Sequence, residues 1–150
     1  MKSVFHSEIF IASDHAGFSM KQYLMERSGY NLVDLGTDSL ESCDYSVFAE
    51  KLSKRILKEE DHCGILICST GIGMSIAANR HKGIRAALCF DRSIAELARR
   101  HNDANVVIFG ARVVGCDAAL DCLRVFLSTQ FEGGRHIRRL RMIDVPTGGE

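Results

Sequence analysis

The sequence predicts an α/β protein with a doubly wound fold and a five-stranded parallel sheet. Five short apolar segments recur along the chain, and each is followed by a segment that has apolar residues at helical spacing. Strands that alternate with helices favour a parallel sheet covered by helices on both faces. Polar residues directly follow three of the strands, at the sheet edge where doubly wound folds bind ligands. The predicted strands are residues 9–12, 32–35, 65–68, 84–89 and 105–109.

The helices predicted between these strands are recognised by their apolar spacing. The first ends near Gly29 and the fourth spans 93–100, with its apolar residues facing the core. A long helix is predicted over 114–127 and a short basic helix over 135–141. The apolar residues at helical spacing are Phe18, Tyr23 and Leu24 in the first helix, Val47, Phe48, Leu52, Ile56 and Leu57 in the second, Met74, Ile76, Ala77 and Ala78 in the third, and Ile94, Leu97 and Ala98 in the fourth.

Length, charge and cysteine spacing limit the class of protein. The chain has 150 residues with 19 basic and 19 acidic side chains, which predicts a single domain over 1–150 and argues against nucleic-acid binding. No apolar run approaches the roughly 20 residues that cross a bilayer, so no membrane partner is expected. The 6 cysteines include no Cys-x-x-Cys pair, which predicts reduced thiols in a cytoplasmic protein.

The segment from Cys63 to Arg80 joins a strand, a glycine loop and the start of a helix. Its loop glycines, Gly71 and Gly73, permit tight turns and a close approach to a ligand. Backbone N–H groups and the positive end of a helix would converge there, which suits a phosphate or a developing oxyanion. Cys68 ends the strand, where the same field favours a thiolate. A simple tight turn with a core cysteine is the structural alternative.

Two further pairs of polar residues are candidates for function. Asp14 and His15 follow the first strand and could bind a sugar hydroxyl and a phosphate. Their structural alternative is a helix cap beside a surface histidine. His101 and Asn102 close the fourth helix, where a histidine can shuttle protons near neutral pH and an amide can donate to an oxyanion. A histidine stabilised by the helix C-terminus is the alternative.

A basic segment near the end of the chain predicts a phosphate site. Arg135 and Arg139 share one helix face at i and i+4, and guanidinium groups bind phosphate through paired hydrogen bonds. Arg112, after the fifth strand, could join them, whereas a solvated surface helix is the alternative. We expect no metal, because no recognised ligand spacing is formed by Asp14, His15 and His101.

Taken together, these motifs resemble the RpiB/LacAB family of sugar-phosphate isomerases. The match runs in order along nearly the whole chain. The matching segments are residues 13–18, 36–37, 44–45, 64–80, 83–86, 101–106, 109–115 and 131–136. The resemblance implies a Rossmann-like α/β/α sandwich that needs no cofactor or metal. It also implies a homodimer or homotetramer with active sites between subunits. The implied reaction interconverts D-ribose 5-phosphate and D-ribulose 5-phosphate, in the pentose phosphate pathway, through a cis-enediolate.

The same resemblance assigns roles to individual residues. Cys68 corresponds to the base that moves the proton between two carbons, and Met74 stands where another branch of the family has a glutamate base. His101 corresponds to the acid/base that opens the sugar ring, with Asp14 as its helper. Thr70 corresponds to the hydroxyl that contacts the substrate oxygens. The implied substrate- and phosphate-binding residues are His15, Tyr45, Ser69, Gly71, Gly73, Asn102, Arg112, Arg135 and Arg139.

Two other functions remain open from the sequence. An allose 6-phosphate or galactose 6-phosphate isomerase of the same family would use the same base with a longer substrate. A non-catalytic sugar-phosphate sensor would bind phosphate without turnover. The presence of Cys68, Thr70 and His101 together argues against a sensor, because binding alone needs no acid/base chemistry.

Overall fold

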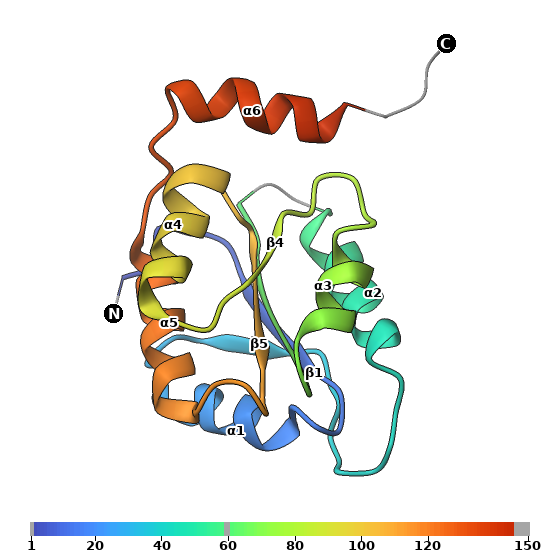
Figure 1. Ribbon diagram of the computed structural model, residues 1–150. Coiled ribbons are helices and arrows are strands. Elements are labelled where there is room, and N and C mark those ends of the chain that lie inside the picture. Colours follow the sequence, from blue (N-terminus) through green and yellow to red (C-terminus); the bar gives the residue numbers. More distant parts are fainter. Residues whose placement is uncertain (1, 59–60, 146–150) are drawn as a thin grey trace.

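The computed structural model describes residues 2–58 and 61–145, and it confirms the predicted fold class. Five parallel strands form one sheet in the order β2-β1-β3-β5-β4 (Figure 1). All five predicted strands are present, with ends that differ by a few residues. Their bounds are Ile9–Ser13 (β1), Leu32–Asp34 (β2), Cys63–Cys68 (β3), Ala86–Leu88 (β4) and Val106–Gly110 (β5).

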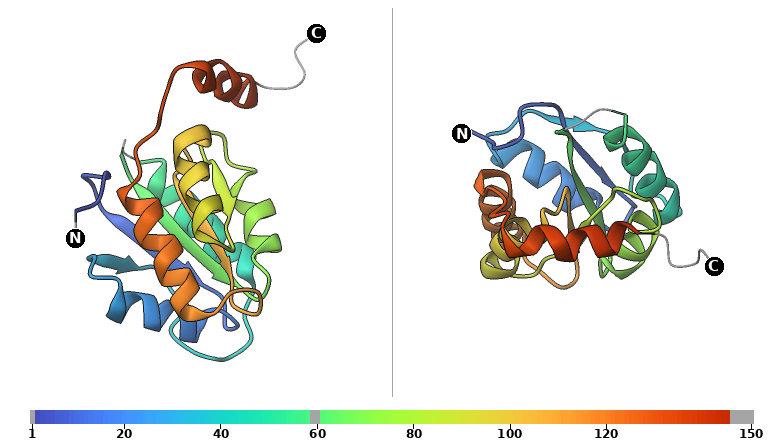
Figure 2. Two further views of the ribbon diagram at one scale, coloured as in Figure 1. Left: turned by 60° about the vertical axis from the view of Figure 1, so that its left-hand side comes forward. Right: turned by 90° about the horizontal axis from the view of Figure 1, so that it is seen from above.

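Helices cover both faces of the sheet, as expected for buried parallel strands. The helices α1, α4 and α5 pack on one face, and α2 and α3 pack on the other (Figures 1 and 2). Alternate strand residues serve the two layers: Ile65 and Ile67 face one, and Leu66 and Cys68 face the other. The helix bounds are Phe18–Arg27 (α1), Tyr45–Ile56 (α2), Ile72–Ala78 (α3), Arg92–Asn102 (α4), Cys116–Ser128 (α5) and Arg135–Asp144 (α6).

Four of the apolar residues recognised by their helical spacing lie on the surface. They are Val47, Leu57, Ile76 and Leu97. The short helix α3 is buried only through Met74 and Ala78. In α4 a buried arginine, Arg99, stands among the core residues, where it donates to the backbone oxygens of Ala104 and Thr129 and stacks on Phe5 and Phe126. A long aliphatic stem and a hydrogen-bonded head group allow this arginine to be buried at a position that the apolar spacing did not assign to the core.

The last helix, α6, stands apart from the α/β body (Figures 1 and 2). It lies beyond the edge where the strands begin, and it buries only His136 and Leu140 against the rest of the chain. Met142 and Ile143 are exposed on the same helix. Among the described residues, no helix has the length and apolar character to cross a membrane. The sequence also favours a frayed tail over 147–150, and these residues lie outside the part of the chain that the structure describes.

Candidate active site

The carboxyl ends of β1, β3 and β5 bring one group of the predicted residues together. Asp14 follows β1, Ser69 and Thr70 follow β3, and Arg112 follows β5 soon after Gly110. The loops are tied by backbone, because the Arg112 N–H donates to the Ser69 oxygen at 2.9 Å. The chain leaves β1 toward β2 on one side and returns to β3 on the other. The edge between β1 and β3 is therefore the switch point at which ligands bind in such folds.

Cys68 lies at the centre of this group, at the end of β3. Its side chain is buried, and its Sγ accepts a hydrogen bond from the Gly71 N–H at 3.2 Å. Gly71 holds this N–H in place with a φ of 80°, and a Cβ there would lie 2.4 Å from the Leu88 side chain. A backbone donor aimed at sulfur stabilises negative charge on it. Burial raises the pKa of two other buried thiols, those of Cys63 and Cys89, to about 12.

Tyr45 and Thr70 border the glycine loop from the solvent side. A Cβ on Gly73 would lie 2.5 Å from the ring of Tyr45, so this ring covers the loop backbone closely. The Thr70 hydroxyl accepts from the Ile72 N–H at 3.3 Å, which fixes the start of α3. Both Tyr45 and Thr70 are exposed, so they are accessible to a ligand above the loop.

Asp14 and His15 occupy the turn between β1 and α1. Asp14 is buried, and its Oδ1 accepts from the Gly17 N–H at 3.1 Å within the turn that precedes α1. The helix cap considered from the sequence is not formed by Asp14, because the N-cap residue of α1 is Gly17 and no side chain caps it. His15 is half-buried, and its Nδ1 accepts from the Cys43 N–H at 3.2 Å. Sequence reasoning assigned no role to Cys43. Because the contact uses its backbone, no pattern of side chains could have indicated it.

The remaining candidates lie at the opposite edge of the sheet. His101 and Asn102 end α4 just before β5, and Arg135 and Arg139 are exposed on α6 (Figure 1). Cys68 pairs with Gly110, the last residue of β5. The first residue of that strand is four positions earlier, about 13 Å away along an extended chain. A single chain therefore forms two separate clusters: the carboxyl-edge cluster around Cys68 and the α4–α6 cluster around His101.

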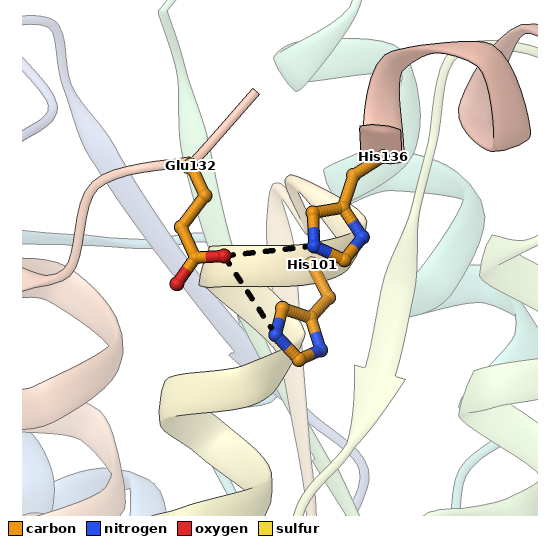
Figure 3. A group of neighbouring side chains, drawn as sticks. All are labelled: His101, Glu132 and His136. Atoms are coloured by element: carbon orange, nitrogen blue, oxygen red, sulfur yellow. Dashed lines mark ion pairs between the residues drawn. The ribbon is translucent and has the colours of Figure 1, made fainter. Parts of the chain in front are cut away.

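Figure 3 shows the core of the α4–α6 cluster, where two imidazole rings face one carboxylate. The rings of His101 and His136 stack at 4.4 Å between centroids. Their Nε2 atoms lie 3.9 Å and 3.5 Å from Glu132 Oε2, while Glu132 Oε1 accepts from Arg100 Nε at 2.5 Å. The hydrogen bond from Arg100 lowers the pKa of Glu132, and burial lowers the pKa of His136, with further lowering by His101 and Arg135.

The ligand atoms of His101, Glu132 and His136 lie within 4.8 Å of one another, which is close enough to hold a cation. The charges around these three residues disfavour a bound cation. Arg100 already pairs with Glu132, and the guanidinium groups of Arg135 and Arg139 act on His136. The positive field therefore favours an anion such as a phosphate here. Sequence reasoning gave Glu132 no separate role, because a lone glutamate between loops carries no distinguishing pattern.

Fold and sheet-edge site together define an α/β protein of the doubly wound class, and comparisons with known proteins narrow this further. A model of the family described as Ribose/Galactose Isomerase matches residues 9–143. Ribose-5-phosphate isomerase B of Escherichia coli is 44% identical over 140 residues, which cover 91% of this chain and 93% of that protein. A putative sugar phosphate isomerase of Rickettsia bellii is 46% identical over 140 residues, covering 91% and 97%.

A solved structure agrees with these sequence relatives. The crystal structure of a ribose 5-phosphate isomerase from Thermotoga maritima superposes with a TM-score of 0.88 at 49% identity, covering 93% of this chain and 98% of that one. The chain belongs to the ribose/galactose isomerase family. It is an isomerase, with the doubly wound fold of its relatives.

Proposed function

We propose that this isomerase interconverts D-ribose 5-phosphate and D-ribulose 5-phosphate, as a step of the pentose phosphate pathway and without metal or cofactor. Relatives at 41% to 44% identity carry the name ribose-5-phosphate isomerase B. The observation that carries the proposal is the hydrogen bond from the Gly71 N–H to Cys68 Sγ at 3.2 Å. It joins a candidate carbon base to a loop of backbone donors, which is what proton transfer next to a carbonyl requires.

The proton transfer follows from these neighbours. The Cys68 thiolate removes the proton from C2 of the open-chain aldose, and the electron pair moves onto the C1 carbonyl oxygen to form the cis-enediolate. Loop N–H groups from Gly71 to Gly73 and the Thr70 hydroxyl stabilise the enediolate oxygens. The Cys68 thiol then returns its proton to C1, while the hydroxyl proton passes from O2 to O1. The product is the ketose, and the thiolate is regenerated.

Ring opening and phosphate binding use the second cluster. In the proposal His101 opens the sugar ring with help from Asp14, and Asn102 contacts a substrate oxygen. Because His101 and Cys68 lie at opposite edges of one chain, a complete site needs His101 from a second copy. A homodimer or homotetramer with sites between subunits is thus part of the proposal. The groups proposed to bind the phosphate and line the site are His15, Tyr45, Ser69, Gly73, Arg112, Arg135 and Arg139.

The proposal also includes a cytoplasmic location. All six cysteines are free, and Cys43 and Cys116 are partly exposed. Unpaired thiols of this kind persist in a reducing compartment. Fractionation of cells that express the protein would check this point directly.

The deciding experiment measures isomerisation of ribose 5-phosphate in the presence of a chelator. Wild type is expected to be active, and Cys68→Ala to lose about a thousandfold or more of kcat, the upper range for a general base. Cys89→Ala is the matched control, since Cys89 is also buried next to a strand but is held as a thiol. If the Cys68→Ala enzyme is active, another residue must be the base.

The same assay separates the alternatives. Higher turnover on allose 6-phosphate or galactose 6-phosphate would replace the pentose with a hexose substrate. If the protein binds the three sugar phosphates through their phosphate but turns over none of them, only the sensor function would fit. That result would set this chain apart from the isomerase family to which it belongs. Binding alone would not need a donor aimed at Cys68 Sγ.

A further inference from the structure

The contact between His15 and the loop that follows β2 carries information about the histidine's tautomer. The Cys43 backbone N–H donates to His15 Nδ1 at 3.2 Å. A backbone amide can only donate, so Nδ1 must present its lone pair and the ring proton must reside on Nε2. The Cys43 Sγ lies 3.9 Å from the same nitrogen, a weaker contact that points to the same edge of the ring.

We infer that the Cys43 backbone N–H fixes His15 as the Nε2–H tautomer and thereby presets it as a neutral donor for the substrate phosphate. The phosphate role of His15 rests on the proposed function, whereas the tautomer does not. Within the part of the chain that the structure describes, Nε2 has no hydrogen-bond partner. His15 is half-buried and therefore accessible. Its ring thus has one nitrogen satisfied by the protein and one donor left for a ligand.

The loop that supplies this N–H is anchored before any ligand binds. Lys21 is fully buried, and its Nζ contacts both Asp34 carboxylate oxygens and the Thr37 carbonyl, each at 2.6 Å. The Thr37 N–H donates to the Ser13 carbonyl at 2.7 Å, which ties the loop to the end of β1. At its other end the loop runs directly into α2. Cys43 therefore reaches His15 from a loop held at both ends.

The tautomer decides whether the histidine attracts or repels a phosphate. Phosphate oxygens are acceptors, so an Nε2–H forms a charge-assisted hydrogen bond, whereas an Nε2 lone pair facing an oxygen is repulsive. In metal sites, a histidine that binds the metal through one ring nitrogen often has its other nitrogen held by a backbone group, which fixes the tautomer. In this protein the same kind of contact would prepare a histidine to bind an anion. Loop docking at Cys43 and phosphate binding at His15 are consequently coupled.

The first test reads the tautomer directly in the free enzyme. Long-range proton–nitrogen NMR spectra, assigned by the loss of signals in His15→Asn, are expected to show an unprotonated Nδ1 and a protonated Nε2. A protonated Nδ1 overturns the inference whatever the enzyme's activity. Addition of inorganic phosphate is expected to shift the Nε2–H signal. If the enzyme is active but that signal does not move, the coupling to phosphate is wrong. If ribose 5-phosphate is not turned over, the proposed function fails while the tautomer result stands.

Two variants separate the backbone of Cys43 from its thiol. Cys43→Ala keeps the N–H and is expected to keep the tautomer and a KM within about twofold of wild type, because only a weak sulfur contact is lost. Cys43→Pro removes the N–H and is expected to raise KM about tenfold, with a smaller change in kcat, as for loss of one hydrogen bond to a charged group. A changed tautomer in Cys43→Ala would assign the effect to sulfur instead. If circular dichroism shows Cys43→Pro to be misfolded, the spectra of wild type and Cys43→Ala decide.

Discussion

The carboxyl-edge cluster and the α4–α6 cluster are built in different ways. Around Cys68 the groups are fixed by backbone: N–H donors of Gly71 and Cys43 and the buried end of β3. Around His101 they are fixed by charged side chains at the surface, with Glu132 between Arg100 and two imidazole rings. Backbone placement preorganises donors without loss of side-chain freedom. The α4–α6 cluster instead combines side chains from separate segments: His101 from the end of α4, Glu132 from the segment before α6 and His136 from α6.

The largest effect expected from this comparison is recovery of activity by mixing two inactive variants. Cys68→Ala disables one cluster and His101→Asn the other. If the sites are shared between subunits, a heterodimer contains one intact site and one doubly disabled site. Random mixing after reversible dissociation should restore about a quarter of wild-type activity, because half of the dimers carry one working site.

The control for this experiment is a mixture of two variants from one cluster. Cys68→Ala mixed with Thr70→Ala leaves every subunit with a damaged carboxyl edge, so activity should stay low. If neither mixture recovers activity, either both clusters act within one chain or the subunits do not exchange. Native mass spectrometry of a mixture in which one variant is isotopically labelled distinguishes these two causes, because it detects heterodimers directly.

A smaller effect, a loss of kcat, is expected from Gly71→Ala, which adds a methyl group. Its φ of 80° is strained for an L residue by about 1–2 kcal/mol, and the new Cβ would lie 2.4 Å from Leu88 Cδ1. Relief of that contact moves the N–H away from Cys68 Sγ, so kcat should fall about a hundredfold, the lower end of the loss that follows removal of one oxyanion donor. Gly115→Ala is the control, because its φ is −72° and nothing lies within 4 Å of the added atom. Equal effects of the two substitutions would contradict the role given to Gly71.

Much of the carboxyl edge could be predicted from sequence, whereas the relation between the two clusters could not. Strand ends follow from apolar runs, and in a parallel sheet those ends meet at one edge, which places Asp14, Ser69 and Arg112 together. The contact between Cys43 and His15 spans 28 residues through a backbone atom, so no residue type signals it. Ile76 and Leu97 have core-like spacing but are exposed. Single apolar side chains are common on protein surfaces, and a periodicity rule cannot distinguish them from core residues.

Stability should depend on the ion pair beneath the carboxyl edge. Lys21→Met keeps the aliphatic stem but leaves Asp34 and the Thr37 carbonyl without their buried partner. Because Asp34 is partly exposed, the loss in unfolding free energy should be about 2 kcal/mol, below the value for a fully buried pair. Lys54→Met is the control at the surface pair with Glu50, where at most about 0.5 kcal/mol is expected. Urea denaturation of both variants measures the difference, and similar losses would remove the distinction between buried and surface pairs.

The smallest effect concerns the acid stability of the α4–α6 cluster. Burial lowers the pKa of His136 below its ordinary value of 6.5, followed by the charges of His101 and Arg135. The unfolded chain therefore binds a proton more readily than the folded one, so stability contributed by the neutral ring is complete above about pH 6.5 and declines as the pH falls below it. His136→Phe keeps a buried ring that cannot titrate. Its unfolding free energy should fall less steeply between about pH 6.5 and 5 than that of wild type. Parallel pH profiles for the two proteins would show that His136 is not the group that makes this cluster sensitive to acid.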